Sequence, residues 1–131
     1  MKLTRGVHKV SASEAEKLAA EAAAQATTMY LIRGDQAVDC ASFFDAVRAS
    51  LPLNPPIFSS DNWDALSDSI WNGLDESDTN RILIVRSNSD RLKESPKDFE
   101  TALYVLQDIT ETIASPELTV GRPKELTVLL T

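Results

Sequence analysis

The sequence contains few of the residues that build most metal and redox sites. Among its 131 residues there is one cysteine, Cys40, and one histidine, His8. An internal disulfide is therefore excluded, and a zinc cluster or a Cys–His catalytic pair lacks the residues it needs. We interpret Cys40 as a packing residue, because no base lies near it in the sequence, and His8 as a surface residue.

Long apolar runs are also absent. No stretch approaches the roughly 18 apolar residues that cross a bilayer. Residues 1–10 lack the apolar segment of a secretory signal. We therefore expect a cytoplasmic protein that does not enter a membrane.

Positive charge is scarce. Thirteen lysine and arginine residues stand against 20 acidic ones, which gives a formal net charge of -7. Direct binding to a nucleic acid or to an anionic membrane is not expected, because both need a concentrated positive surface. The rest of the composition is that of an ordinary globular domain. The expected partner is therefore basic.

Patterns typical of strands and helices alternate along the chain. We predict strands at residues 29–32, 81–86 and 125–130, and helices at residues 39–51, 61–74 and 95–115. Strands separated by helices imply right-handed crossovers, so we expect an α/β fold with a small parallel sheet and packed helices. Residues 28–131 form this domain. Residues 1–27 are an N-terminal extension packed on it, with a candidate edge strand at 7–10 and a helix at 11–26.

One segment concentrates the acidic residues. No lysine or arginine lies between Arg48 and Arg81, whereas six acids do: Asp61, Asp64, Asp68, Asp75, Glu76 and Asp78. At about 100° per residue, an apolar stripe of the predicted helix points to the core, and Asp61, Asp64, Asp68, Trp71 and Asp75 form a second arc. Unpaired like charges one turn apart destabilise a helix by about 0.2–0.5 kcal/mol. A face selected only for solubility normally mixes signs, so this arc predicts a binding surface.

Other interpretations of this arc remain open. It is either a solvated helix face or an interface, and Trp71 is either an exposed anchor or a side chain tucked under the following loop. Asp64 and Asp68 could instead chelate a divalent ion in a metal-dependent enzyme. The chain has no glycine-rich phosphate loop and no second acidic cluster, so we expect no enzyme and no cofactor.

The run Phe58-Ser-Ser-Asp-Asn62-Trp-Asp64-Ala-Leu-Ser-Asp68 resembles the signature helix of the barstar family of ribonuclease inhibitors. The likeness extends over roughly residues 28–131. It implies a three-stranded parallel sheet with packed helices. It also implies a bacterial immunity protein or antitoxin that blocks a basic ribonuclease, or the nuclease domain of a toxin, before secretion. The alternative is an acidic interaction module with another basic partner, and we assume a monomer in either case.

The resemblance also assigns roles to single residues. Asp68 matches the carboxylate that occupies the enzyme's phosphate site, and Asp64 matches a second acid that faces basic side chains. Phe58 matches an aromatic residue that packs on the catalytic histidine, although the family often has tyrosine there. Ser67 replaces an interface tryptophan, for which Trp71 is a candidate substitute. The expected partner-binding residues are Phe58, Asn62, Asp64, Ser67, Asp68, Trp71, Val105 and Asp108, the last being a remote acid on the final helix.

Overall fold

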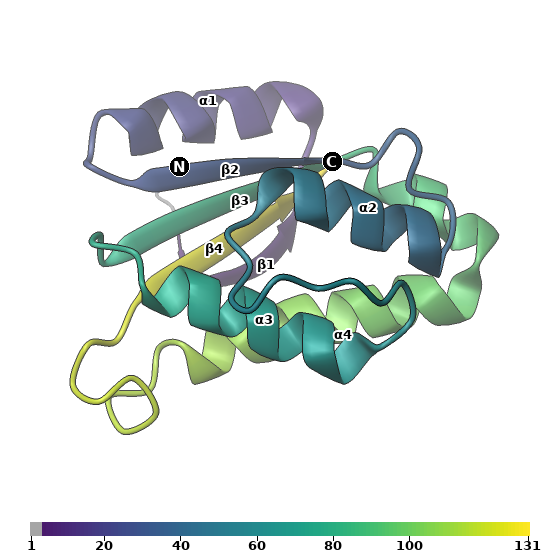
Figure 1. The fold of residues 1–131 in the computed structure, drawn as a ribbon. Coiled ribbons are helices and arrows are strands. Elements are labelled where there is room, and N and C mark those ends of the chain that lie inside the picture. The colour runs from purple at the N-terminus through teal and green to yellow at the C-terminus, as the bar shows by residue number, and fades with distance from the viewer. Residues whose placement is uncertain (1–3) are drawn as a thin grey trace.

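A computed structural model describes residues 4–131. Four parallel strands form one sheet in the order β1-β4-β3-β2, with helices on both faces (Figure 1). The prediction of an α/β fold with a parallel sheet is confirmed. The elements are β1 (Gly6–Lys9), α1 (Ala12–Ala23), β2 (Thr28–Arg33), α2 (Cys40–Ser50), α3 (Trp63–Asp75), β3 (Arg81–Ser87), the 3₁₀ helix η1 (Ser89–Glu94), α4 (Pro96–Thr112) and β4 (Glu125–Leu130).

The sheet has four strands rather than the three that were expected, because β1 joins it. This short strand pairs in parallel with β4, from Gly6 opposite Thr127 to Lys9 opposite Leu130. The chain then enters α1. Ser11 caps this helix, because its hydroxyl accepts a hydrogen bond from the Glu14 amide at 3.1 Å. The N-terminal segment therefore adds both an edge strand and a covering helix.

The two faces of the sheet bury different residues. On one face Ala15, Leu18 and Ala22 of α1 pack against Leu83 and Leu129. On the other face α2, α3 and α4 enclose the main core (Figure 1). Each large apolar side chain buried there stabilises the fold by about 1.5–3 kcal/mol. β3 is covered on both faces, as its unbroken apolar run predicts, since Ile82 and Ile84 face the main core and Leu83 faces α1.

The loop between α2 and α3 is fixed against α3. A side chain at Gly73 would bring its Cβ to 1.5 Å from the Pro52 carbonyl oxygen, so only glycine allows this approach. Nearby, the Asn54 amide donates to the Ser69 carbonyl at 3.1 Å, and the Ser69 hydroxyl donates to the Pro55 carbonyl at 2.5 Å. These contacts occupy one side of α3 and leave its acidic side facing outward.

Candidate functional site

The acidic side of α3 begins at a regular helix cap. The Asn62 side chain accepts a hydrogen bond from the Ala65 amide at 3.1 Å, which satisfies one of the free amides of the first turn. Asp64 lies in the same turn, where the helix dipole favours negative charge. Asn62 is exposed beside it. Asn62 therefore orients the start of the acidic face, whatever it contacts beyond the chain.

Asp64 and Asp68 are both exposed to solvent. In residues 4–131, no ion pair and no hydrogen bond engages either carboxylate, and α1 lies on the other side of the sheet (Figure 1). Arg48 of α2 pairs with Asp45 at 2.6 Å. The two carboxylates are thus free to meet positive charge from outside.

Helices α3 and α4 pack side by side, and a hollow of about 560 Å³ lies between their outer faces. We call it the acidic hollow. Val105, which is almost fully buried, forms part of its lining. Five of the eight predicted partner-binding residues line it together, although they come from two helices: Asp64, Ser67, Asp68, Val105 and Asp108.

Phe58 lies outside this hollow, on the loop before α3. Its side chain is 93% exposed, the highest value among the large apolar residues of the described chain. A separate hollow of about 510 Å³ runs beside it, lined by Arg48, Leu51, Leu53, Pro56, Ile57 and Phe58. Because it is exposed, the Phe58 ring adds little to the stability of the fold. Exposed aromatic rings are common at binding surfaces.

Trp71 is half-buried and packs against the main core. Of the two interpretations of this residue, the structure shows the partly covered one, and Trp71 does not line the acidic hollow. Asp75, one turn further on, is also withdrawn from solvent. Its side chain is 19% exposed and lies 3.8 Å from Arg122. The outward arc of α3 is therefore open only over its first two turns.

Tyr104 is a member of the acidic hollow that sequence reasoning missed. It lies on α4, and its side chain is 68% exposed. Tyr104 and Asp108 are four residues apart, a spacing that places both on one face of a helix. That spacing was the available signal, but only the structure shows that this face adjoins α3.

Cys40 is the first residue of α2, and its thiol contacts the end of the loop between α2 and α3. Its Sγ donates to the Ser60 carbonyl at 3.2 Å. Partial burial raises the pKa of Cys40, and the carboxylates of Asp98 and Asp61 raise it further. A thiol kept protonated is a poor nucleophile, which agrees with a packing role for this residue.

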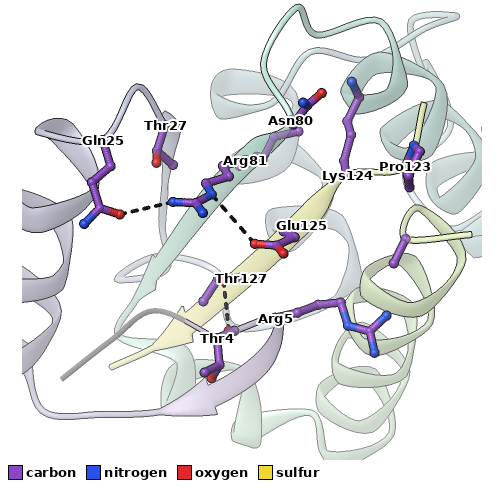
Figure 2. A pocket seen from close by; sticks show the side chains of 12 residues that line it. Thr4, Arg5, Gln25, Thr27, Asn80, Arg81, Pro123, Lys124, Glu125 and Thr127 are labelled. Atoms are coloured by element: carbon purple, nitrogen blue, oxygen red, sulfur yellow. Dashed lines mark hydrogen bonds and ion pairs between the residues drawn. The ribbon is translucent and has the colours of Figure 1, made fainter.

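A larger hollow of about 710 Å³ lies where β3 and β4 begin, and it is lined by several basic residues (Figure 2). Two of its three cations, Arg81 and Lys124, have partners within the chain. Arg81 lies 3.8 Å from Glu125 and donates to Gln25 at 3.3 Å, and Lys124 donates to the Ser77 carbonyl at 2.8 Å. This basic hollow shares no residue with the acidic hollow.

A family comparison places the chain among known proteins. The sequence model of the family described as Barstar (barnase inhibitor) matches residues 27–130. The chain belongs to the barstar family. Barstar proteins are inhibitors of barnase-type ribonucleases and not enzymes. No curated protein matches the chain in a sequence search.

Two further features of the structure concern metal binding and membrane insertion. Within the part of the chain that is described, no cluster of three or more histidine, cysteine or carboxylate side chains is arranged to hold a metal ion. Across residues 4–131, no helix combines the length and the apolarity needed to span a membrane. The acidic hollow gathers five of the eight expected partner-binding residues, which makes it the strongest candidate site of this barstar-family protein.

Proposed function

We propose that this barstar-family protein inhibits a basic ribonuclease by inserting its acidic face into the enzyme's active site. The observation that carries the proposal is the pair of exposed, unpaired carboxylates of Asp64 and Asp68, with Asp108 across the same hollow. An enzyme that cleaves RNA must bind phosphate with positive side chains. A carboxylate placed at that position accepts paired hydrogen bonds from arginine, and such charge-assisted pairs are strong.

Net charge supports the encounter step of this proposal. With -7 on the inhibitor and an excess of positive charge on the enzyme, the two proteins attract each other before they touch. In the proposed setting the protein acts in the cytoplasm of a bacterium, as an immunity protein or antitoxin against a nuclease that the cell makes. Asp68 takes the phosphate position, and Phe58 packs against the enzyme beside it.

An activity titration tests the proposal. Increasing amounts of the protein are added to a barnase-type ribonuclease, and cleavage of a fluorogenic RNA is measured. We expect inhibition that is complete near one inhibitor per enzyme, and a large loss of inhibition in the double variant Asp64→Asn/Asp68→Asn.

The matched control is Glu16→Gln/Glu21→Gln, which removes two exposed charges from α1 on the other side of the sheet. It should inhibit almost as well as the wild type. Equal losses in both double variants would mean that only the overall field matters. Full inhibition by the α3 variant would remove Asp64 and Asp68 from the site, and a wild type without inhibition would contradict the proposed function.

A further inference from the structure

Arg48 of α2 binds the loop on both sides of Phe58. Its Nη1 donates to the carbonyl oxygen of Ile57 at 3.3 Å and to that of Ser59 at 2.8 Å. Its Nη2 donates to the Ser60 hydroxyl at 3.2 Å. One guanidinium therefore holds the carbonyl groups of the two residues that flank Phe58.

The Phe58 ring does not fix its own position. At 93% exposure it has few contacts, whereas the neighbouring Ile57 is buried. The direction in which the ring points is consequently set by the backbone that Arg48 holds. Without that hold, loop residues would sample more conformations, because ordering one residue's backbone requires about 1–2 kcal/mol.

The other half of the loop is held by different contacts. Asn54 and Pro55 bind Ser69 of α3, as described above. After Phe58, the Ser59 hydroxyl accepts hydrogen bonds from the amides of Asp61 at 3.2 Å and Asn62 at 3.0 Å. These bonds fix the residues that immediately precede α3. Arg48 therefore joins α2 to the segment that lies between these two anchored ends.

The chemistry of arginine suits this task. Its guanidinium presents five donors in a rigid plane, so it can bridge several acceptors at once, whereas lysine offers a single ammonium group. Asp45 accepts from Nη2 at 2.6 Å and balances the charge. Arg48 consequently acts as a multi-point donor at this position, and it does not neutralise Asp64 or Asp68.

We infer that Arg48 is a positioning residue for the inhibitory surface: it holds the 57–60 segment so that Phe58 is presented to the ribonuclease in its binding conformation. This inference rests on the proposed function. A loop that is ordered before binding loses less entropy on binding, and the gain appears in the affinity. Arg48 is therefore predicted to increase the affinity by fixing the position of Phe58.

The first test uses the free protein. Arg48→Met keeps much of the apolar stem and removes every donor. We expect the amides of residues 57–61 to exchange with deuterium at least about tenfold faster in this variant, because local opening becomes easier, while amides of α4 keep their rates. The control is Arg91→Met, since Arg91 is exposed and pairs only at 3.8 Å with Glu94. It should leave the loop unchanged.

The second test is a double-mutant cycle with a barnase-type ribonuclease. Arg48→Met should raise Kd by about tenfold in the wild-type background, but by less than about threefold when Phe58 is already alanine, because coupled residues are not additive. Arg48→Lys should lie between the wild type and Arg48→Met. A residue that only stabilised the fold would weaken binding equally in both backgrounds.

The outcomes separate the two proposals. Unchanged loop exchange, or equal effects in the two backgrounds, would overturn the role of Arg48 while the proposed function stands. A wild type that does not bind the ribonuclease would overturn the proposed function and this inference with it. Faster exchange confined to the loop, together with the coupling to Phe58, supports it.

Discussion

Two groups of carboxylates in this protein have opposite surroundings. Asp90 of η1 lies 3.2 Å from the Nζ atoms of both Lys9 and Lys93, and the hydrogen bonds from Lys93 and Lys9 hold the pKa of its carboxyl below the usual range. Asp64 and Asp68 have no cation within reach in residues 4–131. Asp90 is thus paired within the chain, whereas Asp64 and Asp68 are the acids that the proposed function assigns to a partner.

The difference has a consequence for stability as well as for binding. Asp64 gains from the helix dipole at the start of α3. Asp68, one turn further on, has no such support and repels Asp64 by about 0.2–0.5 kcal/mol. A sequence optimised only for folding would carry a lysine at one of these positions. The retained repulsion agrees with the binding role that we propose for this face.

The strongest way to break the comparison is to remove one carboxylate from each group. Asp68→Ala should weaken binding to a barnase-type ribonuclease by more than about 2 kcal/mol, because central charged anchors dominate interface energies. Its melting temperature should change little, since nothing in residues 4–131 pairs with Asp68. Titration calorimetry and thermal unfolding measure the two quantities.

Asp90→Ala is the matched control for this experiment. It removes the same charge from a position outside the acidic hollow and should leave the affinity almost unchanged. A loss below about 0.5 kcal/mol for Asp68→Ala, or an equal loss for both variants, would contradict the assignment of Asp68 to the interface.

Ionic strength gives a second, smaller contrast. Raising the salt concentration from about 0.05 to 0.5 M should slow the association of the wild type by roughly tenfold, since screening removes long-range attraction. The variant Asp64→Asn/Asp68→Asn should show a weaker salt dependence than Glu16→Gln/Glu21→Gln, because its missing charges lie closest to the enzyme. Stopped-flow fluorescence measures both slopes. Identical slopes would show that the position of the charges is irrelevant.

Much of the fold could be predicted from local patterns. The stripe of Trp63, Leu66, Ile70 and Leu74 predicts the buried side of α3; the last three are buried, and Trp63 is partly buried. Ser95 and Pro96 predict the start of α4, which begins at Pro96. These predictions succeed because helix periodicity and proline geometry depend on a few neighbouring residues.

Features that depend on distant segments could not be predicted in this way. A helical wheel gives the angle of Trp71 about α3 but not how far the neighbouring elements reach, so its partial burial stayed open. The pairing of β1 with β4 joins residues more than a hundred positions apart. Tyr104 was missed for the same reason, because the spacing within α4 does not show which helix lies beside it.

Tyr104 provides a third contrast, between two exposed apolar side chains. Tyr104→Ala should weaken binding by about 1 kcal/mol, as expected for an aromatic residue at the edge of an interface. Leu118→Ala removes another exposed side chain, outside the acidic hollow, and should have no effect. Tyr104→Phe keeps the ring and removes the hydroxyl, so it separates their contributions to the affinity. Affinities from surface plasmon resonance check all three, and equal values for Tyr104→Ala and the wild type would place α4 outside the interface.

The smallest expected effect is on stability. Here removal of the paired carboxylate of Asp90 should matter more than removal of a carboxylate from α3. Because the folded-state pKa of Asp90 lies below its usual value of 3.8, its stabilising effect is present above that value and is lost as the pH falls through the folded-state pKa. Asp90→Asn should therefore unfold more easily in urea at about pH 7, by less than about 1 kcal/mol since the pair is exposed. The gap to the wild type should shrink towards about pH 3.

Asp68→Asn is the variant that makes this measurement informative. It removes a carboxylate that repels Asp64 and has no support from the helix dipole, so at about pH 7 it should keep or slightly raise the free energy of unfolding, because a like-charge pair one turn apart is relieved. If Asp68→Asn instead lost as much stability as Asp90→Asn, both carboxylates would be serving the fold. The distinction between a paired structural acid and a free binding acid would then have to be abandoned, since it requires that Asp90→Asn lowers stability and that Asp68→Asn does not.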